Sequence, residues 1–342
     1  MKTVTFGEIM LRLSPPAHAR FLQTGQFDIV AGGGEANVAV SLANCGLDAE
    51  FVTALPDQEL GQIAVNALRA LGVETRHLLR QGPRIGLYFI ENGASQRASK
   101  VIYDRAGSSI AVAKASDFDW NAILSGKDWF HFSGITPAIS PEMRKCVEAA
   151  CKTARKKGVK VSCDLNYRGK MWSIEEARPV MQNLMQYVDL LIANEEHIRT
   201  VLEIDTSSLP TEDTNLTPAG CLSASRMVNE RYKIPLIALT QRRSLSASDN
   251  RFKGSLWSAE NSDAIACSPQ YTMHIVDRVG SGDAFSAGIL TGVQKDWTPE
   301  KTVGFAAAAC CLKHSVEGDF SLMSEDEILA LAAGNGSGSV QR

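Results

Sequence analysis

The segment Asp277-Arg278-Val279-Gly280-Ser281-Gly282-Asp283-Ala284-Phe285-Ser286-Ala287-Gly288 lies between a β-like run and a helix of small residues. Gly280 and Gly282 allow the backbone to turn tightly and to bring its N–H groups close to a ligand. The helix that begins near Gly282 adds the positive end of its dipole. This stretch therefore predicts an anion site of the kind that binds phosphate.

Asp283 lies in the first turn of that helix. Its carboxylate can take a proton from a substrate hydroxyl, while the N–H groups of Gly280, Ser281 and Gly282 stabilise charge on a phosphoryl group in transfer. The alternative is a simple turn followed by an N-terminal helix acid. Short glycine motifs have many false positives, so the segment alone leaves both interpretations open.

The composition is that of an ordinary soluble globular protein. The 342 residues suffice for one large α/β domain or two ordinary ones, with 44% hydrophobic and 21% charged residues. A net charge of -3 gives no indication of a nucleic-acid partner. No apolar run approaches the ~20 residues that span a bilayer, and the chain starts with strand-like Thr3-Val4-Thr5-Phe6 in place of a signal peptide. We expect a cytoplasmic protein without a membrane segment.

The eight cysteines are scattered and form no CxxC pair, so neither a zinc site nor a redox motif is indicated. We expect them to be reduced and mostly buried.

The first part of the chain predicts a strand, a glycine turn and a helix. Residues 3–13 form an apolar-rich strand that Ser14-Pro15-Pro16 ends. Ala31-Gly32-Gly33-Gly34-Glu35-Ala36-Asn37 then leads into a helix over 38–45. Its glycines permit close approach of a ligand, and the Asn37 amide can bond to hydroxyls. The alternative is a flexible loop with a capped helix.

A βα unit over 49–73 is followed by short alternating strands at 85–90 and 100–105 around Glu91-Asn92-Gly93, with no helix between them. They predict an antiparallel flap, which can cover an active site or pair with the sheet edge of another subunit.

After Pro141 the alternation resumes, with helices over 142–157 and 174–185 and strands over 159–164 and 190–193. Polar residues follow these strands, and ligands bind at that edge of open α/β sheets. The residues expected to face one cleft are Asp164, Asn166, Arg168, Asn194 and Glu195. Taken singly, each is more often a loop polar group or a helix cap.

Residues 205–220 predict a surface loop. Strand 236–240 is followed by a basic turn over 241–244 that either meets phosphate or is solvated. Helices over 284–294 and 303–314 should pack closely together beside the anion site. The sequence predicts a single domain over residues 1–333 and a disordered tail over 334–342.

Two motifs now carry a resemblance to a known family. Gly32-Gly33-Gly34-Glu35-Ala36-Asn37-Val38-Ala39 and Asp277-Arg278-Val279-Gly280-Ser281-Gly282-Asp283, in this order with βα units between them, resemble the two signatures of the PfkB (ribokinase-like) carbohydrate kinases. The resemblance covers nearly the whole chain. Within the family, segments 6–15, 103–105, 132–135 and 164–168 look most like those of 2-keto-3-deoxygluconate kinases.

The resemblance implies a three-layer α/β/α ribokinase-like fold with a central, mostly parallel sheet and a small β-sheet lid, whose strands come from about 11–30 and 85–105. It implies a homodimer formed through the lid. The implied reaction is phosphorylation of the 6-hydroxyl of 2-keto-3-deoxy-D-gluconate by ATP with Mg²⁺. The alternatives are a kinase for fructose, ribose or another keto-deoxy sugar acid, or a non-catalytic sugar- or nucleotide-binding homologue.

By position, the resemblance makes Asp283 the base and the N–H groups of Gly280 to Asp283 the anion hole. The implied sugar site consists of Gly33, Gly34, Asn37, Tyr88, Tyr103, Arg105, Ile135, Asn166 and Arg168. The implied nucleotide site consists of Asn194, Thr240, Arg242, Gly280, Gly282 and Lys313, with Asn194 and Glu195 orienting magnesium-bound phosphates through water. Independently of the family, Arg105 and Arg168 are forked donors suited to the carboxylate of a sugar acid.

The chain departs from the family pattern at four places. Arg278 stands in place of Thr and Ser281 in place of Ala, and Arg278 either touches a nucleotide phosphate or points to solvent. His197 stands where the family has Glu, so Glu195 or Glu196 would substitute for it. Thr240-Gln241-Arg242-Arg243 replaces a glycine-containing turn under ATP.

Overall fold

The computed structural model describes residues 1–336 and 338. Its centre is a nine-stranded sheet in the order β16-β15-β14-β11-β10-β9-β1-β4, with β17 also paired to β15. The parallel part comprises β4 (Asp48–Val52), β1 (Lys2–Phe6), β9 (Trp129–Ser133), β10 (Lys160–Asp164), β11 (Leu190–Ala193) and β14 (Leu236–Ser244). Antiparallel β15 (Asp249–Ser258), β16 (Ala266–Cys267) and β17 (Tyr271–His274) complete it. Strands such as β11 are buried throughout, which explains their uninterrupted apolar runs.

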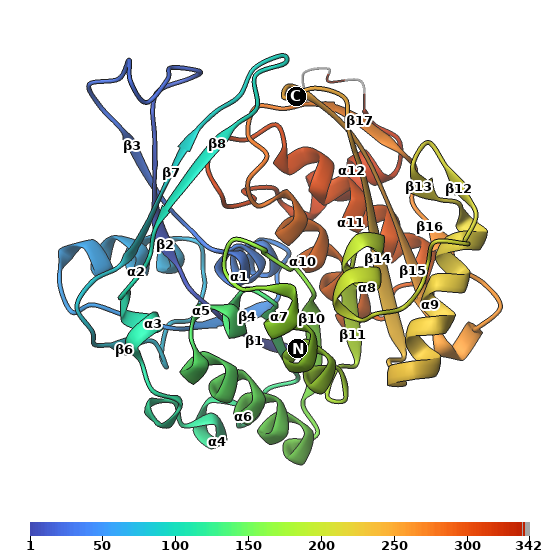
Figure 1. Ribbon diagram of the computed structural model, residues 1–342, viewed down its shortest axis with the longest axis horizontal. Coiled ribbons are helices and arrows are strands. Elements are labelled where there is room, and N and C mark those ends of the chain that lie inside the picture. The colour runs from blue at the N-terminus through green and yellow to red at the C-terminus, as the bar shows by residue number, and fades with distance from the viewer. Residues whose placement is uncertain (337, 339–342) are drawn as a thin grey trace.

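Helices cover both faces of this sheet, which confirms the predicted three-layer α/β/α fold (Figure 1). One face carries α3 (Ser109–Val112), α4 (Trp120–Ile123), α5 (Thr136–Ile139), α6 (Pro141–Lys157), α7 (Ile174–Met185), α8 (Glu195–Val201) and α9 (Pro218–Tyr232). The other carries α1 (Gly34–Asn44), α2 (Glu59–Ala70), α10 (Ser281–Gln294) and α11 (Pro299–Lys313), with α12 (Glu325–Ala332) against α11.

Helices α10 and α11 pack closely, as their small residues predict. A Cβ atom on Gly288 would overlap Ala306, and one on Gly292 would overlap Thr302. The glycines of α10 therefore set the distance between the two helices, and α10 is in turn fixed against α1.

The lid is a separate four-stranded sheet in the order β3 (Asp28–Gly32), β2 (Met10–Ser14), β7 (Gly86–Glu91), β8 (Lys100–Asp104). It rises from one end of the body, blue and cyan in Figure 1. The β7–β8 hairpin is antiparallel as predicted, but β2 and β7 run parallel, so the lid is a mixed sheet.

The expectation of one strand over residues 3–13 is wrong. The chain leaves the central sheet after Phe6 and enters the lid at Met10. Gly7 lies so close to Glu35 that a Cβ atom there would overlap its carboxylate, and Glu8 points inward to Arg105 and Ser108. Apolar residues continue on both sides of this break, so their pattern could not reveal it.

Two other expectations also need correction. Residues 241–244 continue strand β14 and form no turn. The segment 205–220 contains a small hairpin, β12 (Thr211–Glu212) with β13 (Asn215–Leu216), and the start of α9. A further small pair, β5 (Ala54–Leu55) with β6 (Leu79–Arg80), and two 3-10 turns, Ala115–Asp117 and Ala259–Asn261, complete the elements.

Of the predicted tail, residues 334–336 continue from α12 with backbone hydrogen bonds, and 337 and 339–342 lie outside the described residues. All eight cysteines are free thiols, and most are buried. Within the described part of the chain, no helix has both the length and the apolar character needed to cross a membrane.

Candidate active site

A cleft of about 1020 Å³ lies between the lid and the carboxyl ends of the parallel strands. It brings together all but one of the predicted site residues. Those lining it are Gly33, Gly34, Asn37, Tyr88, Tyr103, Arg105, Ile135, Asn166, Arg168, Asn194, Glu195, Thr240, Arg242, Gly280, Ser281, Gly282 and Asp283.

Lys313 is the exception. Its side chain is 0% exposed and does not line the cleft, and its Nζ donates to the carbonyl oxygen of Val316 at 2.9 Å. The last turn of α11 places it behind the cleft, next to Asp277 and Asp319. The expectation that it contacts a nucleotide is wrong for this arrangement, because the side chain has no access to the cleft.

The two glycine motifs meet at Asp283. The Nδ2 of Asn37, on α1, donates to the Oδ2 of Asp283, on α10, at 2.6 Å. The Oδ1 of Asn37 accepts from the N–H of Gly33 at 3.3 Å, which fixes the orientation of the amide. A Cβ atom on Gly34 would lie 3.8 Å from Oδ1 of Asp283. A substrate hydroxyl can therefore approach this carboxylate closely beside the backbone of α1.

Burial raises the pKa of Asp283 to about 7, with Asp164 and Glu35 adding repulsion and the hydrogen bond from Asn37 opposing the shift. A carboxylate with a pKa near 7 accepts a proton more readily than an ordinary one and still exists partly in its ionised form at neutral pH. Both properties suit a general base.

Two further carboxylates lie behind Asp283. Asp164 ends β10, and burial raises its pKa to about 6. Glu35 is buried, and its Oε1 accepts from the hydroxyls of Ser133 and Thr136, each at 2.6 Å. The sequence prediction did not include Ser133 or Thr136 as site residues. Ser133 is the last residue of β9 and Thr136 begins α5 just after it, at the same sheet edge as Asp164. This position at the end of a parallel strand is the signal that could have found them.

The N-termini of α1 and α10 are open toward the cleft. Their N-cap residues are Gly33 and Gly280, and no side chain caps either helix. In contrast, α6, α7, α9 and α11 are capped by Ser140, Ser173, Thr217 and Thr298. Gly280 has φ 81°, and a Cβ atom on it would overlap the carbonyl oxygen of Asp319. Position 280 thus needs glycine, and residues 278–282, here called the anion loop, leave N–H groups for a ligand.

Three arginines add positive charge to the cleft: Arg168, Arg242 and Arg278. Arg242 Nη2 donates to Oγ of Ser281 at 3.3 Å, and Arg278 Nη2 donates to the carbonyl oxygen of Ala247 at 2.8 Å. Burial and then the proximity of Arg242 lower the pKa of Arg278. Among the ion pairs of the described residues, none involves these three guanidinium groups. Their charge is therefore available to an anionic ligand, and Arg278 lines the cleft.

Arg105 differs from Arg168, although both were predicted to bind a sugar acid. Arg105 forms a buried ion pair with Glu8, which also accepts from Oγ of Ser108 at 2.6 Å, and it lies 5.9 Å from the centre of the Tyr103 ring. Burial raises the pKa of Glu8. The charge of Arg105 is thus balanced within the protein, whereas Arg168 is exposed to the cleft.

The polar residues at the start of α8 have protein partners. Oδ1 of Asn194 accepts from the N–H of His197 at 2.7 Å, and Glu195 accepts from the hydroxyl of Thr206. Burial lowers the pKa of His197 to about 4. Asn194 thus serves as a helix cap, and its Nδ2 group remains for a ligand.

The described residues contain no group of three or more His, Cys, Asp or Glu side chains able to hold a metal ion. Mg²⁺ that is bound mainly by phosphates and water needs no such group. The acids on this side of the cleft, Glu195 and Glu196, fit an indirect site of that kind.

Comparison with known proteins decides the family. The model of the pfkB family of carbohydrate kinases matches residues 1–222 and 252–324. The chain belongs to this family. It is a sugar kinase with a ribokinase-like fold.

Its relatives include several sugar-acid kinases. The chain is 33% identical to 2-dehydro-3-deoxygalactonokinase from Haloferax volcanii over 335 residues, which cover 98% of each chain. The crystal structure of 2-dehydro-3-deoxygluconokinase from Thermotoga maritima is 49% identical, covers 98% of each chain and superposes with a TM-score of 0.93. A pfkB family carbohydrate kinase from Listeria grayi is 36% identical, covers 97% of this chain and 100% of its own, and has a TM-score of 0.90.

Proposed function

We propose that the protein phosphorylates the 6-hydroxyl of 2-keto-3-deoxy-D-gluconate with ATP, giving 2-keto-3-deoxy-6-phosphogluconate and ADP. The observation that carries this proposal is the contact between Asn37 and Asp283, because it holds a carboxylate suited to the role of base at the junction of two open helix N-termini. The Thermotoga maritima relative, which bears the name of this activity, supports the choice of sugar.

In the proposed reaction, Asp283 removes the proton from the sugar hydroxyl. The oxygen then attacks the γ-phosphorus in line, and the bond from phosphorus to the bridging oxygen of ADP breaks. The N–H groups of the anion loop and the guanidinium group of Arg242 stabilise the charge on the transferring group. Asn194 and Glu195 would hold, through water, a Mg²⁺ ion bound to the phosphates, and this ion would supply positive charge to neutralise them.

The substrate carboxylate is assigned to Arg168, since this guanidinium lines the cleft and belongs to no ion pair among the described residues. A neutral hexose or pentose would leave this charge without a partner. Arg105, held by Glu8, is suited to orient Tyr103 and to complete the wall of the sugar site. A second candidate substrate is 2-keto-3-deoxygalactonate, favoured by the name of the Haloferax volcanii relative.

Release of ADP should be measured with both keto-deoxy acids, fructose and ribose. We expect turnover with an acid, and Arg168→Gln should weaken kcat/KM for the acid far more than for any neutral sugar. Arg155→Gln, which removes a surface ion pair with Asp189, is the matched control. Equal losses on acids and neutral sugars would refute the acid assignment, and absence of ADP with every sugar would favour the non-catalytic binding protein.

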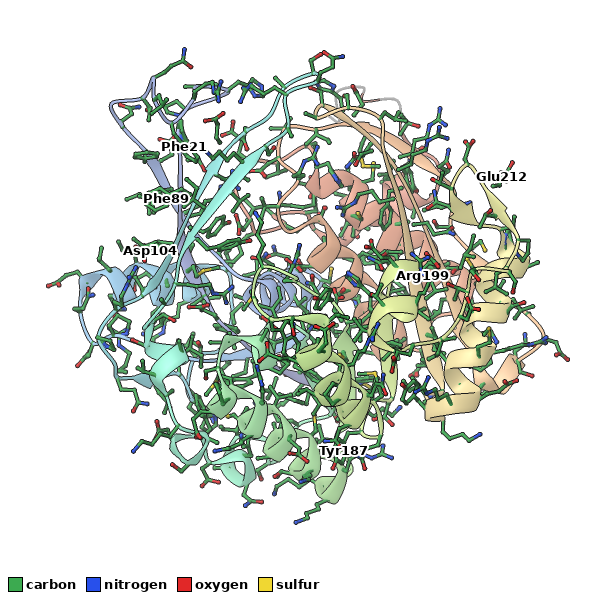
Figure 2. The ribbon with its side chains drawn as sticks, in the orientation of Figure 1. Phe21, Phe89, Asp104, Tyr187, Arg199 and Glu212 are labelled. Atoms are coloured by element: carbon green, nitrogen blue, oxygen red, sulfur yellow. The ribbon has the colours of Figure 1, made fainter. Side chains whose placement is uncertain are left out.

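The lid also supports the proposal of a homodimer. On its outer face, Ile29, Leu13, Phe89 and Ile102 stand in register across all four strands, and Ile29 and Ile102 are 52% and 45% exposed. Phe27 packs between Phe21 and Phe89, and the latter two lie along the same side of the lid in Figure 2. Such an apolar row is suited to pack against the lid of a second copy of the chain.

Light scattering should show a dimer that Ile102→Asp dissociates. A wild-type protein that is a monomer would refute the proposed pairing of the lids.

A further inference from the structure

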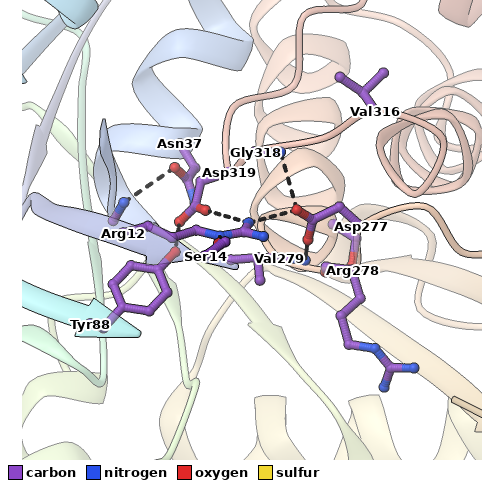
Figure 3. Close-up of polar contacts among 12 residues, drawn as sticks. Arg12, Ser14, Asn37, Tyr88, Asp277, Arg278, Val279, Val316, Gly318 and Asp319 are labelled. Carbon is purple, nitrogen blue, oxygen red and sulfur yellow. Dashed lines mark hydrogen bonds and ion pairs between the residues drawn. The ribbon is translucent and has the colours of Figure 1, made fainter. Parts of the chain in front are cut away.

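A buried polar cluster lies where the lid meets the anion loop (Figure 3). We call it the lid–loop cluster. Arg12 and Tyr88 come from lid strands β2 and β7, Asp277 immediately precedes the anion loop, and Asp319 follows α11. Their exposed fractions are 3%, 4%, 2% and 3%. The proposed reaction assigns no role to Arg12, Asp277 or Asp319.

Arg12 holds both carboxylates. Its Nη1 lies 2.6 Å from Oδ2 of Asp277 and 3.1 Å from Oδ1 of Asp319, and its Nε donates to Oγ of Ser14 at 2.7 Å. Tyr88 donates its hydroxyl to Oδ2 of Asp319. Two strands of the lid are thus bonded to two segments that surround the phosphate site.

The two carboxylates fix the backbone of that site. Asp277 accepts from the N–H of Val279 at 3.0 Å and from the N–H of Gly318 at 3.1 Å. The carbonyl group of Asp319 occupies the space beside Gly280. The position of the anion loop therefore depends on Asp277 and Asp319, and these depend on Arg12.

The cluster also reaches the sugar site. Tyr88 and Asp319 line the cleft, and a Cβ atom on Gly32 would overlap the carboxylate of Asp319. Lys313, the buried lysine behind the cleft, supplies a second positive charge near Asp277 and Asp319. One continuous set of contacts thus connects a lid residue that faces the sugar with the loop that faces the nucleotide.

Stability alone is a poor explanation for this arrangement, because a buried ion pair seldom stabilises a fold more than well-packed apolar residues would. The guanidinium group is planar and offers several donors in a fixed geometry, so it can hold two carboxylates and a hydroxyl in one relative position. Such a fixed arrangement is needed to position groups relative to one another, whereas neutralising the two carboxylates would not need it.

We propose that Arg12 is a positioning residue that couples the lid over the sugar to the anion loop, so that sugar and nucleotide strengthen each other's binding. When a sugar orders Tyr88 and the lid strands, Arg12 orders Asp277 and Asp319, and these order the loop. The same coupling acts in the opposite direction, as linkage requires. The inference rests on the proposed function, which supplies the two ligands.

The test is a calorimetric titration with a non-hydrolysable ATP analogue in the presence and absence of 2-keto-3-deoxygluconate. In the wild type, saturating sugar should tighten binding of the analogue by about 5- to 150-fold, the usual range of coupling between sites. In Arg12→Lys this factor should fall toward one, because an ammonium group cannot hold the three partners together. Ser14→Ala, which frees Nε of Arg12, should give an intermediate factor.

The matched control is Arg97→Lys, which alters a lid ion pair with Glu91 at 2.9 Å, outside the lid–loop cluster. It should retain the wild-type factor. An unchanged factor in folded Arg12→Lys, or an equal loss in Arg97→Lys, would overturn the proposal. If Arg12→Lys does not fold, the coupling factor of Ser14→Ala is the test, and an unchanged factor in that variant would overturn the proposal. A wild type that releases ADP without any coupling overturns this inference alone, whereas a wild type without turnover on any sugar overturns the proposed function.

Discussion

Helices α10 and α8 both begin at the cleft with an acid in the first turn, but their surroundings differ. In α10 the N-cap is Gly280, no side chain caps the helix, and burial raises the pKa of Asp283 to about 7. In α8 the cap is Asn194, which accepts from the N–H of His197 at 2.7 Å, and Glu195 accepts from Thr206. The N-terminus of α10 is open to a ligand, whereas the polar groups at the N-terminus of α8 already have hydrogen-bond partners within the protein.

Under the proposed function, this difference explains why the start of α10, and not that of α8, would hold the base. Both helices have the dipole and the acid that the sequence reveals. Only α10 combines an uncapped start with a neighbouring helix end, that of α1, whose Asn37 orients the acid. We therefore expect changes in α10 to affect the chemical step and changes in α8 to affect mainly stability and the use of metal and nucleotide.

The largest effect is expected for Asp283→Asn. Removal of a general base should lower kcat by about 10²- to 10⁴-fold with the fold retained, because the amide cannot accept the hydroxyl proton. Glu195→Gln, the equivalent change in α8, should lower kcat less than about tenfold and mainly raise the Mg²⁺ concentration required. Steady-state ADP release with varied Mg²⁺ measures both. Near-normal turnover in Asp283→Asn would mean that Asp283 is not the general base.

Gly280→Ala should have the next largest effect. The left-handed backbone costs roughly 1–3 kcal/mol for a residue with a side chain, and the Cβ would displace either the anion loop or Asp319. We expect kcat to fall by about 10²-fold, the loss typical of an anion-hole donor.

Gly282→Ala is the control for this change, since a Cβ there meets no atom within 4 Å. It should retain most of the wild-type kcat. Equal losses in the two variants, measured per folded molecule, would show that the anion loop needs flexibility and not this particular backbone position.

Much of the fold was predictable because its signals are local. Helix α7 and strand β11 begin and end where the sequence placed them, since Ser173 caps the helix and apolar residues fill the strand. The break at Gly7 was not predictable, because its cause is the distant carboxylate of Glu35. The extension of β14 through residues 241–244 likewise depends on its pairing with β15.

The same distinction applies to the site. The glycines and Asp283 follow from the motifs, and the resemblance to the family supplied most of the other lining residues. The burial of Lys313 and the ion pair between Arg105 and Glu8 depend on how α11 and the lid pack, which no local pattern contains. Arg12 belongs to segment 6–15, which carries part of the resemblance, but nothing in the sequence indicated its burial, since a charged residue within a lid strand predicts solvent exposure.

A pH profile tests whether the raised pKa of Asp283 distinguishes the start of α10 from that of α8. The proposed reaction needs ionised Asp283, whose pKa burial raises to about 7, so kcat/KM should rise with pH up to about 7 and fall about tenfold per unit below it. Glu195→Gln should keep this limb, because Asp283 is unchanged. A profile that is flat between pH 5 and 8 would contradict the assignment of the base.

Asn194 gives the smallest and most discriminating effect. If its main role is to cap α8, Asn194→Ala should lower the free energy of unfolding by about 1 kcal/mol, while Asn194→Asp, which keeps the accepting oxygen, should not. Denaturant titration measures this.

Both changes remove the Nδ2 donor, so both should raise the KM for ATP by the same small factor, a few-fold at most, if Asn194 acts only through water. A rise of more than about tenfold in the Asp variant would mean that the amide contacts a phosphate directly, since the new carboxylate would then repel it. In that case the N-terminus of α8 would also bind a ligand directly. The remaining difference between α8 and α10 would be that only α10 carries the base.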